Sequence, residues 1–484
     1  MRLFFKLIGA ALLVLIAVLA YNTASYKPIK TEVATITPIA VDGDAMAQLM
    51  SQAVRFKTIS FDNSSDADPV QFSEFVAWLA AVFPAAHGAM ELTLINDLTP
   101  LYRWQGRDTE TKPVLLTAHY DVVPVGEDAA NVWDHPPFAG VIADGFVHGR
   151  GTLDDKGSIV TMMQAVETLV RDGFQPNQTV YFAFGHDEEI GGEDGAGAVV
   201  SHLRTQGITL DWSLDEGSML LDGIVPGIDK PIASINVAEK GYVTVDITAK
   251  GEGGHSSMPP RETAVGALAK GIARLQDAPV PGGLTGMTKD MFDGMAPHFG
   301  LLERVLFANQ WLFRPLLESQ LSKAVTTDAV MRSTMAPTML QASNKENVLA
   351  QSATATVNYR IHPRDTIAGL IQHTHDHLHN DDLKVTPRPG AREASRISDA
   401  AAPAFLRIAT SVQQVFGDVA IVAGLTIAAT DSRHYETISD NSYRILPFIF
   451  GPQDVPRIHG KNERISIENL VAGTQFYAAL LADL

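Results

Sequence analysis

The chain has 484 residues, no cysteine, and a formal net charge of −18 from 37 basic and 55 acidic residues. The lack of cysteine excludes disulfides, a cysteine nucleophile and thiolate ligands, so a transition metal must be held by His, Asp or Glu. The acidic excess argues against a nucleic-acid partner, because phosphate binding needs clustered Lys and Arg. The 15 histidines are therefore the side chains to follow.

The N-terminus has the pattern of a targeting or anchoring segment. Two cations lie within residues 1–6, and an uncharged apolar run covers 7–21. The run is near the upper length of a signal peptide, and with residues 3–5 it is nearly long enough to span a bilayer. We expect 1–21 to be a cleaved signal peptide or a retained membrane anchor, followed by a linker at 22–41. Both alternatives place the remaining chain outside the cytoplasm, as a periplasmic, secreted or membrane-anchored protein.

The region from 42 to 240 alternates helical and strand-like patterns. Helical spacing or short apolar runs mark, in chain order, helices at 42–58 and 70–83, a strand at 114–118, a helix at 159–170, and strands at 179–184 and 210–214. Strand, helix and strand in this order predict parallel βαβ units with buried strands. Polar residues follow each strand directly, and an open α/β sheet places its site at the carboxyl ends of its strands.

The pattern changes near residue 240. Strands with one solvated face are predicted at 242–250 and 354–360, with helices at 262–275 and 366–378, and apolar strands return at 419–422 and 445–450. We therefore expect an α/β fold with a doubly wound, mostly parallel sheet. The main domain comprises 42–240 and 386–484, and an α+β domain is inserted at 241–385. A Met-, Pro- and Phe-rich stretch at 278–335 has no predicted structure; it is interpreted as an acyl-channel lining or as packing or a dimer contact.

Acids and histidines gather at the predicted strand ends. They are, in chain order, His119, Asp121, Asp154, Asp155, Glu188, Glu189, Asp215, Glu216 and His459. Taken singly, each has an ordinary explanation, such as a helix cap, a solvated turn or a structural histidine. Together they suit two zinc ions that share a bridging carboxylate, with one further glutamate as general base. No G-x-S-x-G, H-E-x-x-H, P-loop or G-x-G-x-x-G motif competes with this reading.

These residues lie in the ordered segments HYDVVPV, WDHPPFAG, GRGTLDDKG, GHDEEIGG, LDEG, GGHSS, ATDSRHY and RIHG. The set resembles the M20 family of zinc metallopeptidases over nearly the whole chain after the linker. The resemblance implies that His119 and Asp215 hold one zinc ion. It further implies that Glu189 and His459 hold the other and that Asp154 bridges the two.

The same resemblance implies catalytic roles. Glu188 would be the general base, Asp121 would orient the first histidine ligand, and His255, in GGHSS, would polarise the scissile carbonyl. Glu216 is an alternative to its neighbour Asp215, since members of the family differ in the acid used at this point.

Three further positions match substrate contacts of the family. Arg433, Arg360 and Asn347 would meet the substrate carboxylate, with ordinary surface ion pairing as the alternative for the two arginines. Asn347 is followed by Val-Leu-Ala where the family often has Val-Ile-Pro. The inserted domain resembles the family's lid or dimerisation domain, so a monomer and a homodimer through this domain are both compatible with the sequence.

The implied activity is hydrolysis of an amide bond next to an amino acid with a free carboxylate, by a carboxypeptidase acting on short peptides. An N-acyl (fatty-acyl) amino acid amidohydrolase is the alternative within the enzyme class. A metal- or peptide-binding protein on the same fold is the alternative without activity. Two Zn²⁺ ions are the expected cofactors, and Co²⁺ or Mn²⁺ would fit the same ligands.

Overall fold

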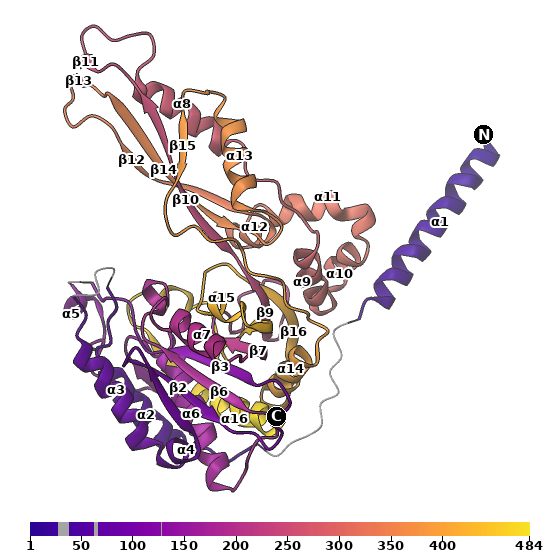
Figure 1. The fold of residues 1–484 in the computed structure, drawn as a ribbon. Coiled ribbons are helices and arrows are strands. Elements are labelled where there is room, and N and C mark those ends of the chain that lie inside the picture. Colours follow the sequence, from indigo (N-terminus) through magenta and orange to yellow (C-terminus); the bar gives the residue numbers. More distant parts are fainter. Residues whose placement is uncertain (28–37, 62–65, 127) are drawn as a thin grey trace.

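The computed structural model describes residues 1–27, 38–61, 66–126 and 128–484. These residues form an N-terminal helix, an α/β domain around a ten-stranded sheet, and an inserted domain with a separate four-stranded sheet (Figure 1). The α/β architecture with an inserted α+β domain agrees with the sequence prediction.

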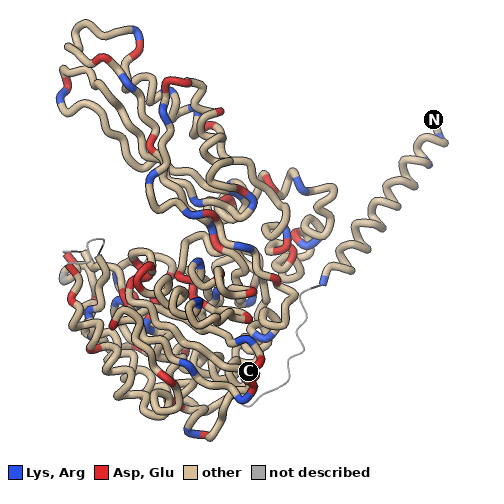
Figure 2. Tube along the Cα trace, viewed as in Figure 1, with Lys and Arg blue, Asp and Glu red and all other residues tan. Residues whose placement is uncertain are grey.

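The N-terminal helix α1 (Arg2–Ser25) is long and apolar enough to cross a membrane, with a mean hydropathy of 2.7 over an 18-residue window. Its only charged residues, Arg2 and Lys6, lie near its N-terminal end, and the rest of the helix is tan in Figure 2. The helix continues past the predicted boundary at residue 21 and so includes the start of the predicted linker. Within that linker, residues 28–37 lie outside the described part of the chain.

The large sheet is mixed, with a parallel centre. Its strands are β1 (Glu91–Ile95), β2 (Thr99–Trp104), β3 (Val114–His119), β6 (Val180–Gly185), β7 (Leu210–Asp215), β8 (Leu220–Leu221), β9 (Ile232–Glu239), β16 (Ala420–Thr426), β17 (Ser439–Arg444) and β18 (Ile449–Phe450). They lie in the order β1-β2-β6-β3-β7-β17-β9-β8-β18, with β16 beside β9. The neighbours β6, β3, β7 and β17 are mutually parallel, as are β9 and β16, whereas β1 and β2 form an antiparallel edge.

Helices cover both faces of this sheet because alternate strand residues point to opposite sides. Leu116 and Phe182 belong to the larger core, whereas Leu115 and Tyr181 belong to the core beneath α7. The helices on the larger-core side are α2 (Gly43–Arg55), α3 (Pro69–Val82), α4 (Pro84–Ala89), α6 (Lys156–Arg171), α14 (Pro403–Phe416) and α16 (Ile467–Ala482). On the other side lie α7 (Ala196–Thr205) and α15 (Ser432–Tyr435). A short helix α5 (Ala129–Val132) and a small sheet of β4 (Val141–Ala143), β5 (Phe146–His148) and β19 (Arg464–Ser466) complete this domain.

The inserted domain is built on an antiparallel sheet of its own, in the order β12-β14-β10-β15. Its strands are β10 (Gly241–Lys250), β12 (Thr334–Gln341), β14 (Ser352–Ile361) and β15 (Lys384–Pro387), and its covering helices are α8 (Ala264–Gln276) and α13 (Ile367–Leu378). A short ladder of β11 (Gly254–His255) and β13 (Val348–Leu349) forms its far tip (Figure 1). The proposed boundary at 241 is the first residue of β10, and the boundary at 385 lies inside β15, two residues before its end.

The unassigned stretch 278–335 is mainly helical. It forms α9 (Met287–Met295), α10 (Leu301–Ala308), α11 (Gln310–Leu321) and α12 (Val325–Met331). Met291 and Phe292 share a hydrophobic core with Val422 of β16, so these helices cover the edge of the large sheet. They also lie beside the end of α1 (Figure 1).

One strand prediction was only partly right. The apolar run at 445–450 contains only the short β18, and the strand that enters the sheet centre, β17, comes earlier in a polar sequence. Its side chains are buried as pairs, because Ser442 hydrogen-bonds Ser213 at 2.8 Å and Arg444 contacts Glu239 at 2.9 Å. Satisfied polar pairs can occupy a core strand, which a hydrophobicity pattern does not detect.

Candidate active site

The candidate residues converge at the carboxyl ends of the parallel strands. His119 is the last residue of β3, Asp215 is the last of β7, and the turn η2 (Glu188–Ile190) follows β6. Asp154 lies just before α6, on a peptide bond to Asp155 that is cis. Parallel neighbours end at the same sheet edge, so residues far apart in sequence meet there.

Asp154 lies between the two candidate histidines. Its Oδ1 is 2.9 Å from His119 Nε2, and its Oδ2 is 3.0 Å from His459 Nε2. The Oε2 atom of Glu189 is also 3.2 Å from His459 Nε2. One oxygen of Asp154 thus faces each imidazole, which is the arrangement that a carboxylate shared by two cations requires.

Asp121 positions both the first histidine and the acidic turn. Its Oδ1 is 3.2 Å from His119 Nδ1, which fixes the imidazole orientation. The same carboxylate accepts hydrogen bonds from the backbone N–H groups of Glu188 at 3.2 Å and Glu189 at 3.1 Å. Ser60, which no sequence pattern marks, donates to its Oδ2 at 2.7 Å.

The third strand end offers two acids that differ in placement. Among the described residues, two groups bring potential ligand atoms within 4.8 Å of one another: His119, Asp154 and Glu189, and His119, Glu188 and Glu216. Glu216 also lines the cavity. Asp215 belongs to neither group; its Oδ1 accepts from the N–H of Glu216 at 2.9 Å, and its Oδ2 is buried without a partner among the described residues. Both acids stay candidates, and the geometry favours Glu216.

The cluster concentrates negative charge in a buried place. Burial raises the pKa of Glu188 well above its ordinary range, and Asp431 and Glu189 raise it further against the effect of His119. Burial likewise raises the pKa of Glu216.

The histidines and the central aspartate respond to one another. Hydrogen bonds to Asp154 and Glu189 raise the pKa of His459 to about 10. Burial acts to raise the pKa of Asp154, but its hydrogen bonds with His119 and His459 outweigh burial and lower it. The site therefore has more carboxyl groups than imidazoles, and a bound cation would favour their charged forms.

The donor set fits divalent metal ions. It consists of imidazole nitrogens and carboxylate oxygens, which suit Zn²⁺ and also Co²⁺ or Mn²⁺. Glu189 Oε1 is buried without a hydrogen-bond partner among the described residues, as a ligand atom for a cation would be.

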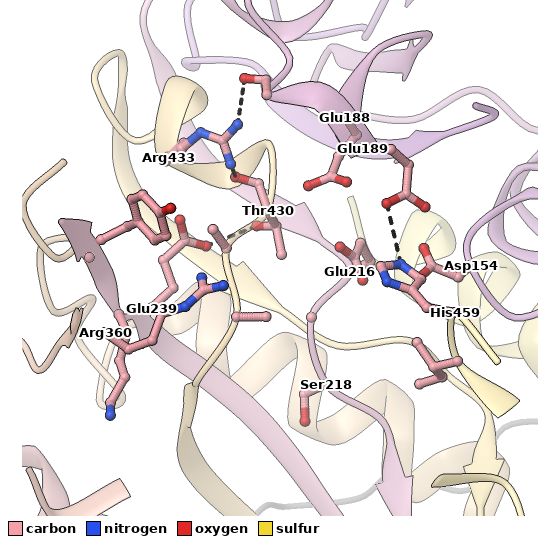
Figure 3. A pocket seen from close by; sticks show the side chains of 18 of the residues that line it. Asp154, Glu188, Glu189, Glu216, Ser218, Glu239, Arg360, Thr430, Arg433 and His459 are labelled. Carbon is pink, nitrogen blue, oxygen red and sulfur yellow. Dashed lines mark hydrogen bonds and ion pairs between the residues drawn. The ribbon is translucent and has the colours of Figure 1, made fainter. Parts of the chain in front are cut away.

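The cavity in front of this cluster has a volume of about 640 Å³ and a cationic opposite wall. Glu188, Glu189, Glu216, Asp154 and His459 lie on one side in Figure 3, and Arg433 and Arg360 lie on the other. The described residues that line it include none from 278–335, so that stretch packs against the sheet and does not line a channel into this cavity.

Two arginines of that wall are oriented by contacts with neighbouring residues. Arg433 Nη1 donates to Thr430 O at 2.9 Å, and its Nη2 donates to Gly191 O. The guanidinium of Arg360 lies 5.1 Å from the ring centre of Tyr242.

A third arginine, Arg392, also lines the cavity, and sequence reasoning missed it. Its Nη1 is buried without a hydrogen-bond partner among the described residues. Burial and the nearby Arg433 lower its pKa. A single arginine in the segment that returns from the inserted domain has no spacing pattern that would reveal this position.

Glu463 is a second residue that sequence reasoning missed. Its Oε1 accepts from the N–H groups of Leu153 at 2.9 Å and Asp154 at 3.3 Å, and its Oε2 contacts Arg150 Nη1 at 2.5 Å. This fully buried carboxylate therefore holds the loop that presents Asp154. It lies four residues after His459, which was the available clue.

His255 and Asn347 are not at the cavity. His255 is exposed in β11, where its Nδ1 accepts from the N–H of Ser257 at 3.2 Å. Asn347 accepts through its backbone oxygen from the N–H of Ser256 at 3.1 Å. The two lie together at the tip of the inserted domain (Figure 1), and neither lines the cavity.

Comparison with known proteins identifies the family. Residues 115–483 match peptidase family M20/M25/M40. The chain belongs to this family. It is 36% identical to the probable carboxypeptidase S-like 2 of Dictyostelium discoideum, over 97% of this chain and 92% of that protein. It is 34% identical to the N-fatty-acyl-amino acid synthase/hydrolase of Xenopus tropicalis, over 98% and 93% respectively. Carboxypeptidase S of Saccharomyces cerevisiae is 28% identical over 88% and 82%.

Solved structures share the fold. The M20 family metallo-carboxypeptidase of Sulfolobus solfataricus aligns with a TM-score of 0.62 at 18% identity, over 91% of this chain and 99% of that one. Human carnosine dipeptidase 1 aligns with a TM-score of 0.63 at 16% identity, over 93% and 100%. The predicted fold and the prediction of an M20-type metallopeptidase or hydrolase are confirmed.

Proposed function

We propose that this M20-family enzyme uses two zinc ions to hydrolyse the amide bond that joins a terminal amino acid to the rest of a short peptide. One observation carries the proposal: a histidine–carboxylate cluster faces three arginines across one cavity of about 640 Å³. The first wall suits metal ions, and the second suits the carboxylate of the released amino acid.

The predicted ligand scheme assigns His119 with Asp215 or Glu216 to one ion, Glu189 with His459 to the other, and Asp154 to both. A pair of such ions supplies Lewis acidity toward the amide carbonyl and makes water a better nucleophile at neutral pH. Zinc is proposed over Co²⁺ and Mn²⁺ because imidazole and carboxylate donors are its usual ligands in catalytic sites.

Glu188 is the proposed general base. It points into the cavity beside the ligand cluster (Figure 3), and burial with nearby acids raises its pKa, so it readily holds a proton. Glu188 takes a proton from the attacking water and delivers it to the leaving amine nitrogen. Asp121 keeps this residue in place through the hydrogen bond to its backbone N–H.

The arginine wall is proposed to bind the carboxylate of the leaving amino acid. Guanidinium groups bind carboxylates in a two-pronged geometry, and Arg392 and Arg433 each have a buried nitrogen without a partner among the described residues. Binding of this carboxylate sets the distance from the chain end to the scissile amide, which makes the enzyme a carboxypeptidase.

His255 and Asn347 act, in this proposal, only when the tip of an inserted domain reaches a cavity. Either the inserted domain of the same chain closes, or a second copy docks and contributes its tip. A monomer and a homodimer are therefore distinguished by which chain supplies His255, and an activity test of mixed inactive variants separates them.

An N-acyl amino acid is the second candidate substrate. The cavity is also lined by the apolar side chains of Met219, Leu221, Phe450 and Ile458, which suit an acyl chain as well as a peptide side chain. The arginine wall would bind the same carboxylate in both cases, so the two substrates differ only on the acyl side.

The catalytic domain is proposed to work outside the cytoplasm, in the periplasm, secreted or anchored. Arg2 and Lys6 precede the apolar part of α1, and positive charge tends to stay on the cytoplasmic side. The chain after α1 then emerges on the opposite side.

The test uses the purified full chain with its metal content measured. Dipeptides and N-fatty-acyl amino acids that share the same terminal residue are assayed with and without a chelator, and each has an amidated counterpart without the carboxylate. We expect cleavage that needs the metal and the free carboxylate. Activity that survives chelation, or equal rates on amidated substrates, would contradict the proposal, and the ratio of the two acyl classes decides between the candidates.

A further inference from the structure

The helices of the inserted domain nearest to α1 carry an exposed apolar surface. It consists of Leu301 and Leu302 on α10 and of Trp311, Leu312 and Leu316 on α11; Leu301 is 76% and Trp311 62% exposed. On α11 these side chains recur at positions i, i+1 and i+5, which fall on one side of a helix. Its opposite side is covered, since Leu317 is buried in the core shared with β16.

This surface is joined to the end of α1 by specific polar contacts. Asn309, between α10 and α11, donates to Leu19 O at 3.3 Å, and its Oδ1 accepts from Asn22 at 2.9 Å. Arg304 donates to Tyr26 O at 2.9 Å, and the Tyr26 hydroxyl hydrogen-bonds Asp293. These contacts fix α10 and α11 beside the helix that is long enough to span a membrane.

The contacts fall at the depth where α1 would leave the bilayer. Leu19 lies six residues before the helix end at Ser25, which corresponds to about 9 Å along the axis. In the 18-residue window of α1 that best fits a membrane span, 0% of the residues are buried in the protein. A membrane crossed by α1 would therefore have its outer interface level with α10 and α11.

Three cations near the surface are paired with acids within the protein. Arg314 contacts Glu318 at 2.7 Å, Arg332 contacts Asp328 at 2.8 Å, and Lys289 contacts Asp293. Paired charges reduce the cost of approaching lipid, and Trp is favoured where headgroups meet acyl chains. The composition therefore fits a lipid interface.

We propose that α1 is retained as a membrane anchor and that the exposed apolar surface of α10 and α11 lies in the outer interfacial layer of the same membrane. The protein would then be held by a spanning helix and an interfacial patch together, which fixes the orientation of the α/β domain relative to the bilayer. This proposal concerns attachment to the membrane and does not depend on the substrate.

Because the chain has no native cysteine, a single introduced cysteine can be labelled site-specifically. The full chain carrying Leu312→Cys is labelled with an environment-sensitive fluorophore and placed in vesicles of phosphatidylethanolamine and phosphatidylglycerol. Met258→Cys is the matched control, because Met258 is also a highly exposed apolar residue but lies near the tip of the inserted domain. Leu302→Cys gives a second, independent position on the patch.

Nitroxide-labelled lipids are expected to quench the labels at 312 and 302 several-fold more than the label at 258, and aqueous iodide is expected to show the opposite order. Equal iodide quenching at all three positions would overturn the proposal. Shielding of 312 and 302 from both quenchers would mean that a second protein copy covers the patch, which also overturns it. N-terminal sequencing of the membrane-bound chain that shows loss of α1 would refute the retained anchor.

Discussion

The proposed catalytic residues fall into two regions that are built in opposite ways. The strand-end cluster is buried, and Asp121 alone contacts His119, Ser60 and the backbone N–H groups of the acidic turn. The tip of the inserted domain is exposed, and among the described residues the His255 side chain hydrogen-bonds only Ser257 of its own turn. The first region is organised before substrate arrives, whereas the second has to be brought to the cavity.

This difference shows which part of the reaction is fixed by folding. Buried, mutually hydrogen-bonded groups hold ligand atoms in place and need no rearrangement to bind metal. A surface hairpin can serve catalysis only through movement or through a second copy. Substitutions in the strand-end cluster should therefore change metal binding or the chemical step. Substitutions at the tip should change activity without changing the bound metal.

The largest loss is expected for Glu188→Gln. Glutamine keeps the shape of the side chain but cannot accept the proton, so kcat should fall by about 10²–10⁴-fold. Bound metal should stay at the level of the unmodified enzyme, as measured by atomic emission. Glu193→Gln is the matched control, since Glu193 is exposed on the same loop. An active Glu188→Gln enzyme would remove this residue from the mechanism.

His255→Ala tests whether the exposed tip takes part in catalysis. If His255 stabilises the developing charge on the carbonyl oxygen, kcat should fall by about 10²–10³-fold. Metal content and melting temperature should not change, because the side chain is exposed and its hydrogen bonds within the described part of the chain are to Ser257 of its own turn. Met258→Ala, three positions after His255 on the same tip, is the control. An unchanged kcat would leave the strand-end cluster as the whole catalytic centre.

A mixing experiment sharpens the same comparison. Glu188→Gln and His255→Ala chains are each inactive in the expected scheme, but a mixed dimer contains one intact cavity served by an intact tip. Recovery of activity on mixing would show that the tip comes from a second copy. No recovery, together with a monomeric mass in solution, would indicate closure within one chain.

The strand-end region was largely predictable because each signal was local. An apolar run followed directly by His119 or Asp215, or a few residues later by Glu188, identifies both a buried strand and its carboxyl end, and parallel strands then bring those ends together. The polar strand β17 was not predictable in this way. Its Arg444 is fully buried, and its charged partner, Glu239, lies 205 positions earlier.

Residues that support the site from a distance were the least visible in the sequence. Glu463 contacts Asp154, and Arg392 lines the cavity. Apart from the closeness of Glu463 to His459 in the sequence, neither residue has a pattern that marks it. The location of His255 could not be predicted either, because the sequence does not show how far the hairpin that carries it extends from the sheet.

The pair Asp215 and Glu216 allows a smaller, more selective test of the buried region. Glu216→Gln should lower the affinity for one metal ion by at least ~10–100-fold, the loss that follows removal of a residue that only supports a ligand. The second metal ion should stay bound. Asp215→Asn should have the weaker effect if Glu216 is the ligand, as the grouping of Glu216 with His119 and Glu188 favours. Zinc titration with a competing chelator measures both. The reverse order of effects would assign the ligand to Asp215.

The smallest expected effect concerns the cationic wall, which lies between the two regions. Arg392→Ala should raise KM for substrates with a free carboxylate by roughly 10–100-fold, the value of one hydrogen bond to a charged group, and should change kcat little. Amidated substrates should be unaffected. Arg396→Ala is a suitable control, because Arg396 hydrogen-bonds the backbone of Glu436 and Ser439 and does not line the cavity. A fall in kcat for both substrate types would instead mean that Arg392 supports the geometry of the strand-end cluster, and the two regions would then be less separate than their contacts indicate.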